Sequence, residues 1–184
     1  MRILVVMSLC CLGAAAQEGG FQLEDVARAA TVMVDGDLAK RIQTPRSVSS
    51  MLVEDPRDRW AASDKYEVDH AAFLTMKKTL TRLTRLCSAT CDVNLWMPVP
   101  KKPGNIQVLI RTLNETSQFW PWGALTQETP PEMAGVLKTG QRVTVSRRPG
   151  IVSVLAPVHD SLGDIAGLVE VVSRVQPDPQ ENVQ

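Results

Sequence analysis

The sequence predicts an α+β fold in which a five-stranded antiparallel sheet packs against a long N-terminal helix and a second helix. Three observations lead to this prediction. Apolar residues recur at helical spacing through the first half of the chain, and the period becomes strand-like beyond Cys91. Short turns containing Gly, Pro or Asp separate the later segments. Helices grouped ahead of strands, without an alternation of the two, are typical of an antiparallel sheet.

Residues 1–16 have the three parts of a secretory signal peptide. Arg2 supplies the positive start, Ile3 to Leu12 form an apolar run, and Ala14 to Ala16 end it. The run is shorter than the roughly 20 apolar residues that cross a bilayer. Cleavage after Ala16 would deliver a periplasmic or secreted protein whose mature chain is not inserted in a membrane. An uncleaved anchor is the alternative, and lipidation is a lesser one because no small residue precedes either leader cysteine.

Length and charge narrow the class of protein. Residues 17–174 have the size of one domain, and the proline-containing polar tail, 175–184, is expected to be disordered. Twenty Lys and Arg balance 20 Asp and Glu. This balance argues against a nucleic-acid surface and gives no reason to expect binding to a membrane surface. No phosphate loop, metal-binding group or nucleophile motif is recognisable, so we expect neither an enzyme nor a cofactor.

Cys87 and Cys91 are the two cysteines that follow the leader. In an oxidising compartment, a lone pair at this spacing is expected to form a disulfide. Two reduced, buried cysteines are the alternative. A metal site would need further ligands, and the two histidines, His70 and His159, lie in unrelated segments.

Two amphipathic helices are predicted ahead of the sheet. The first covers about 23–43 and ends before Pro45, and a short helix around 48–53 lies in the connection that follows. The second covers about 69–87, with Asp69 as its cap. The apolar face of the first helix consists of Leu23, Val26, Ala30, Val34, Leu38 and Ile42. The cations of the second helix that lie off its apolar seam, and are expected to form a solvated face, are Lys77, Lys78, Arg82 and Arg85.

The sheet region extends from about residue 93 to residue 173. Its longest connection, 112–126, is expected to be a loop, and a small helix follows. Thr129, Pro130 and Glu132 have the order of a capping box at the start of this helix, and Gly140 ends it. The five predicted strands are Val93–Met97, Ile106–Arg111, Arg142–Ser146, Ile151–Val158 and Ile165–Ser173, of which the last two form a hairpin.

Two stretches carry a resemblance to a known family. One is the last hairpin, Val152–Asp160 with Gly163 and Ala166–Val171. The other runs from Phe119–Gly123 through Glu132, Leu137, Lys138 and Gly140 to the turn Arg147–Gly150. In this order they resemble the extracytoplasmic Cache sensor domains, relatives of the PAS fold in bacterial chemoreceptors and histidine kinases. The likeness covers about 23–174.

The resemblance implies a single Cache-like domain with a ligand cavity on one face of the sheet. It also implies dimerisation through the Leu23 to Ile42 face of the long N-terminal helix. Family members usually continue into a transmembrane helix and a signalling module, whereas this chain ends soon after Pro177-Asp178-Pro179. A signal would therefore pass to a partner, such as a membrane receptor or a kinase.

Five side chains are candidates for ligand binding. Trp120 and Trp122 either wall a pocket or seal the edge of the sheet as a small core. Arg148 could bind a carboxylate with help from Arg111, although an arginine in a turn is often simply solvated. Tyr66, the one tyrosine, could donate from its hydroxyl or pack on the surface.

The sequence thus favours an exported, sensory protein that binds a small organic molecule, and a carboxylate is a suitable ligand. A structural or partner-binding protein of the same fold, with its pocket filled by its own side chains, is the alternative. An enzyme that uses His159 or the cysteines is a weaker hypothesis, because no acid, base and nucleophile set can be assembled.

Overall fold

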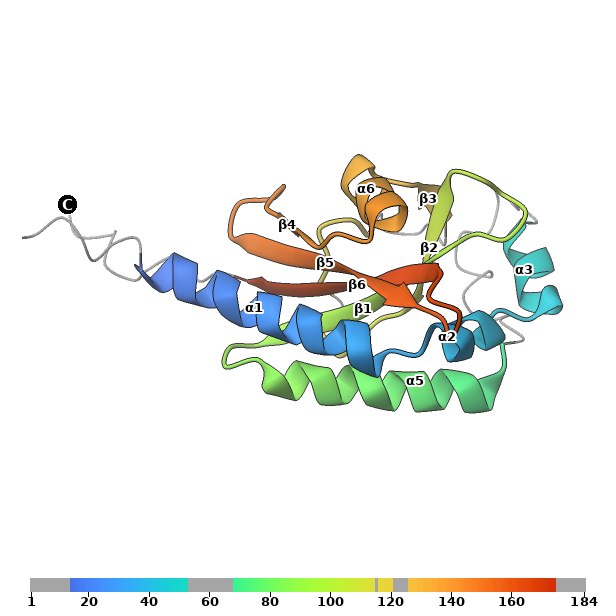
Figure 1. The fold of residues 1–184 in the computed structure, drawn as a ribbon, viewed down its shortest axis with the longest axis horizontal. Coiled ribbons are helices and arrows are strands. Elements are labelled where there is room, and N and C mark those ends of the chain that lie inside the picture. Colours follow the sequence, from blue (N-terminus) through green and yellow to red (C-terminus); the bar gives the residue numbers. More distant parts are fainter. Residues whose placement is uncertain (1–13, 53–67, 115, 121–125, 175–184) are drawn as a thin grey trace, which may run out of the picture.

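A six-stranded antiparallel sheet forms the centre of the structure, a computed structural model that describes residues 14–52, 68–114, 116–120 and 126–174 (Figure 1). The strand order is β3-β2-β1-β6-β5-β4. The strands are β1 Cys91–Pro98, β2 Asn105–Ile110, β3 Thr126–Glu128, β4 Val143–Val145, β5 Ile151–His159 and β6 Ile165–Arg174. The two central strands, β1 and β6, are therefore paired on both edges, and residues on them lie in the middle of the sheet.

All five predicted strands are present, but the predicted strand count was wrong. The sixth strand, β3, lies at the end of the segment that was predicted as a loop, and it pairs with β2 from Asn105↔Glu128 to Gln107↔Thr126. Its three residues are polar and at most half-buried. Backbone hydrogen bonds to β2 hold this short strand in the sheet, and it buries no apolar side chains. Its sequence therefore lacks the alternation of apolar and polar residues from which strands are predicted.

The helices lie on both sides of the sheet (Figure 1). On one side α1 and α5 lie next to each other, and α2 continues from α1, while α6 lies on the opposite side. Their bounds are α1 Ala14–Met33, α2 Gly36–Ile42, α3 Pro45–Leu52, α5 His70–Leu83 and α6 Pro131–Thr139, with a 3₁₀ turn, η1, at Thr84–Leu86. Among the described residues, none of the helices combines the length and the apolar character that crossing a bilayer requires.

The predicted long helix over 23–43 is two helices. The first helix, α1, ends at Met33. The Asp35 side chain then accepts hydrogen bonds from the backbone N–H groups of Asp37 and Leu38 and so caps α2. The break brings Gly36 against the end of β5, where a Cβ atom would lie 2.5 Å from the carbonyl oxygen of His159. The apolar periodicity continues across the break because both helices pack on the same face of the sheet.

The other two helix predictions hold in part. Asp69 caps α5 as predicted, accepting a hydrogen bond from the Ala72 N–H at 3.0 Å. Gly140 ends α6 with a positive φ of 70°. The predicted capping box was wrong by one position, because Pro130 is the N-cap and makes no side-chain cap. Glu132 is bound by Arg147 instead.

Both faces of the sheet are buried, and each has its own apolar core. The core under α1, α2 and α5 contains nearly the whole apolar face predicted for the first helix, so this face is used inside the domain and is not available for the predicted dimer. The smaller core under α6 consists of Trp96, Ile106, Phe119, Met133, Val136, Val145, Leu155 and Leu168. A two-sided core explains why β1 and β6 are apolar along most of their length.

Candidate functional site

Glu170 is a fully buried carboxylate in the middle of β6, on the face of the sheet that α6 covers. Five groups donate hydrogen bonds to it: Ser117 Oγ at 2.6 Å, Ser153 Oγ at 2.8 Å, the Gln118 N–H at 3.0 Å, Trp96 Nε1 at 3.1 Å and Asn94 Nδ2 at 3.4 Å. Burial raises the pKa of Glu170 above its usual value, and the hydrogen bonds act in the opposite direction. Two donors, Ser117 and Gln118, belong to the connection between β2 and β3, which is thereby held against the sheet.

Asp92, on the neighbouring strand β1, holds the earlier part of the same connection. Its Oδ1 accepts hydrogen bonds from Thr112 Oγ1 at 2.9 Å and the Asn114 N–H at 3.0 Å. Its Oδ2 accepts one from the Thr116 N–H at 2.9 Å. The two carboxylates therefore hold the described residues 112–114 and 116–118, and the protein's own side chains fill this central part of the sheet face.

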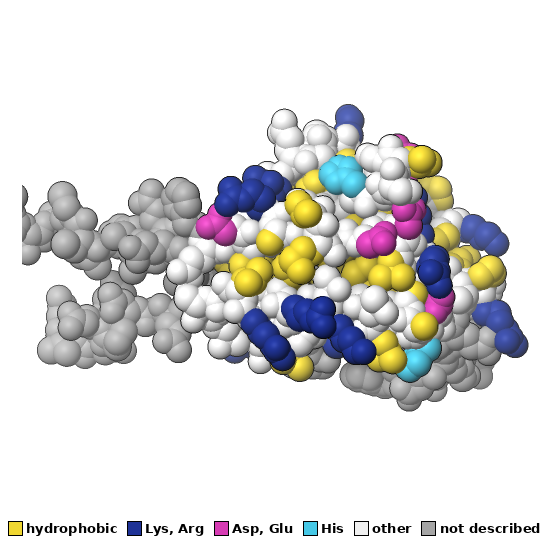
Figure 2. Space-filling view, turned by 60° about the horizontal axis from the view of Figure 1, so that its bottom comes forward, with side chains coloured by type: hydrophobic (Ala, Val, Ile, Leu, Met, Phe, Trp, Pro, Cys, Tyr) yellow, Lys and Arg dark blue, Asp and Glu magenta, His cyan; other side chains and the backbone are white. Residues whose placement is uncertain are grey.

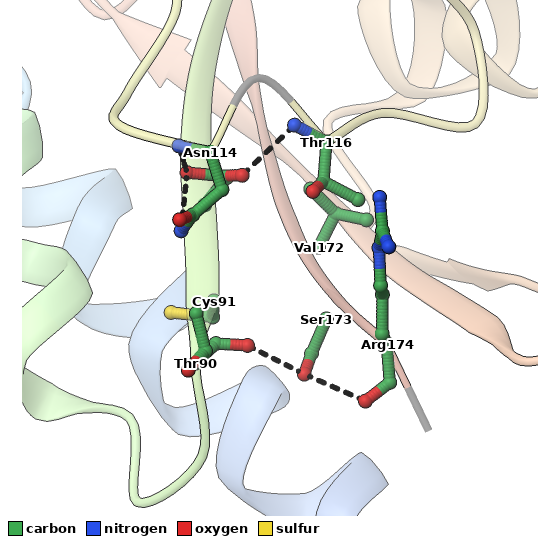
Figure 3. A pocket seen from close by; sticks show the side chains of 8 residues that line it. Thr90, Cys91, Asn114, Thr116, Val172, Ser173 and Arg174 are labelled. Carbon is green, nitrogen blue, oxygen red and sulfur yellow. Dashed lines mark hydrogen bonds between the residues drawn. The ribbon is translucent and has the colours of Figure 1, made fainter. Parts of the chain in front are cut away.

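A cleft of about 480 Å³ opens where β1 begins and β6 ends (Figure 3). Its walls come from the two central strands and from the segment that Asp92 holds. Figure 3 shows the Arg174 side chain extending past Val172 toward Thr116. The lining residues are Thr90, Cys91, Asp92, Asn114, Thr116, Val172, Ser173 and Arg174.

Three polar groups of the cleft have unused hydrogen-bonding capacity. Within the described residues, the Arg174 guanidinium has no ion-pair partner, and neither Thr116 Oγ1 nor Asn114 Oδ1 makes a hydrogen bond. The Asp92 carboxylate is partly occupied, because its Oδ1 accepts from Thr112 and from the backbone and side chain of Asn114, while its Oδ2 accepts only from the Thr116 N–H. The cleft can thus offer a cation, a hydroxyl and an amide oxygen to a bound molecule.

The predicted disulfide is present and borders this cleft. Cys87, after η1, is bonded to Cys91, whose Cα lies 6.2 Å away at the start of β1. Thr90 directly precedes Cys91, and its carbonyl accepts a hydrogen bond from Ser173 Oγ at 2.9 Å. The bridge therefore connects the end of α5 to a wall of the cleft. Since the helix ends before Cys87, the spacing of four residues is no obstacle to the bond.

The structure brings two of the predicted ligand-binding residues together. The Arg111 guanidinium lies 4.1 Å from the ring centroid of Trp120, a cation–π contact, and both side chains are half-buried. Arg148 lies exposed in the turn before β5, where its backbone N–H donates to Gln118 Oε1 at 3.2 Å. None of these three residues lines the cleft.

The remaining two predicted residues, Trp122 and Tyr66, lie outside the described residues.

Arg147, which precedes Arg148 in the turn, forms an ion pair with Glu132 of α6. Arg147 Nε donates to Glu132 Oε1 at 2.8 Å, and its guanidinium lies over the Phe119 ring. This pairing holds the pKa of Glu132 below its usual value, and it links the turn to α6.

Sequence reasoning missed the buried polar residues of β1 and β6 and the residues that line the cleft. The signal for Glu170 was available, because it is the one charged residue in the apolar run from Ile165 to Val172. Asp92 and Asn94 likewise alternate with Val93 and Leu95 in β1. Nothing in the sequence marked Arg174, which became part of a site when β6 placed it beside β1.

No protein-family model and no curated protein matches the chain. Two solved structures give weak structural likenesses. An extracellular ligand binding receptor from Desulfohalobium retbaense DSM5692 is 15% identical, with a TM-score of 0.40, over 88% of this chain and 26% of the receptor. A GAF domain from A. aeolicus in an inactive state is 7% identical, with a TM-score of 0.35, over 86% of this chain and 83% of that domain. The chain spans about a quarter of the receptor's length.

Proposed function

We propose that this chain is an exported sensory domain, without catalytic activity, that binds a small polar organic molecule in the cleft between β1 and β6. The cleft itself is the observation that carries the proposal. Its volume of about 480 Å³ lies within the range of roughly 300–1,000 Å³ that small-molecule sites occupy. Its unused polar groups would orient a ligand, and the apolar side chain of Val172 would contact it.

A ligand with a carboxylate fits this arrangement best. The Arg174 guanidinium could bind a carboxylate through two parallel hydrogen bonds. Asn114 Oδ1 would then accept a hydrogen bond from a second polar group such as a hydroxyl or an amine, and the Thr116 hydroxyl could accept from such a group or donate to it. Because Asp92 also lines the cleft, we expect the ligand carboxylate to bind at Arg174 and to lie away from the Asp92 carboxylate.

The cleft opens at the end of the sheet, where a second protein could reach it. A membrane receptor or kinase that contacts this end would distinguish the filled from the empty cleft. The Cache resemblance supports this role, and the leader at residues 1–16 supports delivery to the compartment in which it would act.

A thermal-shift screen of the purified protein tests the proposal. A panel of carboxylic acids, amino acids, amines and purines should contain a compound that raises the melting temperature saturably, since binding to the native state adds RT ln(1 + [L]/Kd) to its stability. Arg174→Gln and Thr116→Val should remove this shift. Arg148→Gln is the matched control, because it removes an exposed arginine outside the cleft.

The same variants distinguish binding in the cleft from binding at the residues that the sequence predicted, Trp120 and Arg148. If Arg148→Gln or Trp120→Ala removes the shift and Arg174→Gln does not, the ligand binds at Trp120 and the cleft proposal is wrong.

One observation favours a second function, a partner-binding protein without a small ligand. The sheet face under α6 is filled by Trp96, Phe119 and Met133 together with the hydrogen bonds to Glu170. No shift across the panel would support this function, and a partner would then be sought by pull-down.

A further inference from the structure

Helix α5 presents a basic face to solvent. Lys78, Arg82 and Arg85 follow one another at steps of four and three, which places them on one side of the helix and its 3₁₀ extension. All three are exposed, and the stretch from His70 to Leu86 contains no acidic residue. Figure 2 shows the resulting row of Lys and Arg side chains over the helix.

These three cations have no partners in the described part of the protein. Other basic residues on the same side of the molecule are paired: Arg28 with Asp25, Arg41 with Asp69 and Lys40 with Asp160. Lys77, the fourth cation of the helix, donates to the carbonyl of Arg111. Within the described residues, Lys78, Arg82 and Arg85 make no ion pair or hydrogen bond.

Exposed leucines lie at both ends of the basic row. Leu74 precedes Lys78 by one turn and is 42% exposed, and Leu86 follows Arg85 and is 58% exposed. Further exposed apolar side chains, Val32 and Met33, end α1, which lies next to α5 (Figure 1). Figure 2 shows hydrophobic side chains grouped beside the basic row. Cations and leucines thus share one outward surface.

We infer that this surface, defined by Leu74, Lys78, Arg82, Arg85 and Leu86, adsorbs to the headgroup layer of an anionic membrane. The cations would lie against lipid phosphates while the two leucines enter the boundary between headgroups and acyl chains. The helix would lie flat on the membrane without crossing it. The balanced charge of the whole chain gave no hint of this surface, because the acidic residues lie on other elements.

The shape of the surface favours a lipid layer over a protein partner. Its cations stand on the outer side of a single helix, and within the described residues none of the cleft-lining groups lies beside them to orient a protein side chain. A fluid headgroup layer needs no shape complementarity, and each nearby Lys or Arg adds about a factor of five to its affinity. Three cations therefore predict weak, reversible binding that salt removes.

Co-sedimentation with vesicles tests the inference. The purified chain should sediment with vesicles of equimolar phosphatidylglycerol and phosphatidylcholine but not with phosphatidylcholine alone. Binding should fall between about 0.1 M and about 1 M salt, as the screening length shortens from about 10 Å to about 3 Å. The double variant Lys78→Glu/Arg82→Glu should bind at least about 30-fold more weakly, since two attractions are lost.

The matched control is Lys101→Glu/Lys138→Glu, which changes the net charge equally at exposed positions away from α5 and should bind like the wild type. The protein used for all variants begins at Gln17, the N-terminus proposed above, so the apolar residues 3–12 are absent. Equal binding of the two double variants would overturn the inference. So would a failure of the wild type to sediment with the anionic vesicles, in which case an acidic protein surface would be sought for these cations.

Discussion

Glu170 shows how one buried charge can organise a connection far from it in sequence. Among the described residues no cation binds its carboxylate, and its five donors come from two strands, β1 and β5, and from the segment that follows β2. A buried carboxylate without donors would cost several kcal/mol. Here the donors offset part of that cost, and they also determine where Ser117 and Gln118 lie. Burial of this carboxylate therefore has an unfavourable desolvation energy, and the hydrogen bonds that it requires fix the position of the loop that contains Ser117 and Gln118.

Glu170→Gln should destabilise the protein by about 1–3 kcal/mol, because one side of the amide would point an N–H at the Gln118 N–H or another donor. The effect should depend on pH. A carboxyl whose folded pKa lies above its unfolded value binds a proton more readily in the folded state, so wild-type stability falls as pH rises from about 4.5 through the raised pKa. The amide has no such dependence. The free-energy gap between the two proteins, measured by urea unfolding, should therefore narrow with rising pH.

The exposed carboxyl of Glu128 provides the control, and Glu128→Gln should change the free energy of unfolding by less than about 0.5 kcal/mol. A gap that widens as pH rises would mean that the five hydrogen bonds outweigh burial and that the folded carboxyl is the stronger acid.

At the residue scale, the sequence could indicate which side chains have suitable chemistry for a site, but not which side chains the fold brings next to one another. The predicted disulfide is present, and its prediction rested on the spacing of the two cysteines and on the expected oxidising compartment. The Arg111–Trp120 contact joins two predicted residues without making a pocket. The sequence gave no reason to select Arg174, because its place in the cleft depends on the pairing of β6 with β1.

At the scale of elements, periodicity located the strands and helices but not the break between α1 and α2. Leu23 to Ile42 keep one apolar face on the sheet across the break, so the pattern alone reads as a single helix. The local signal was Asp35 followed by Gly36, a cap and a residue without a Cβ. It is tertiary contact with the end of β5 that makes the glycine necessary.

Gly36→Ala should therefore destabilise the fold. A Cβ at this position would lie 2.5 Å from the His159 oxygen and 2.8 Å from the Asp160 nitrogen, both backbone atoms that cannot rotate away. Moving α2 to relieve the overlap should cost about 1–3 kcal/mol. Gly135→Ala in α6 is the matched control, since its Cβ would meet nothing within 4 Å. That variant should be more stable by up to about 1 kcal/mol. Equal melting temperatures for the two variants in differential scanning calorimetry would contradict the contact.

At the scale of the whole molecule, the sheet separates two environments. One face packs on three helices through an almost purely apolar core, and the other combines a smaller apolar core with the hydrogen bonds of Asp92 and Glu170. The fold class followed from the order of the segments. Which face would be polar, and where a cleft would open, did not, because both depend on how the connection after β2 folds back on the sheet.

We expect the protein to be exported, processed and oxidised, because residues 1–16 have the order of a signal peptide and a disulfide such as Cys87–Cys91 is typical of an oxidising compartment. The exported protein should begin at Gln17, and its intact mass should be lower than that of the reduced chain by two hydrogen atoms. Ala16→Asp places a charge where the peptidase needs a small residue, so this variant should retain its leader. A bridged protein that keeps residues 1–16 in the unmodified sequence would contradict the cleavage site, and two free thiols would contradict the disulfide.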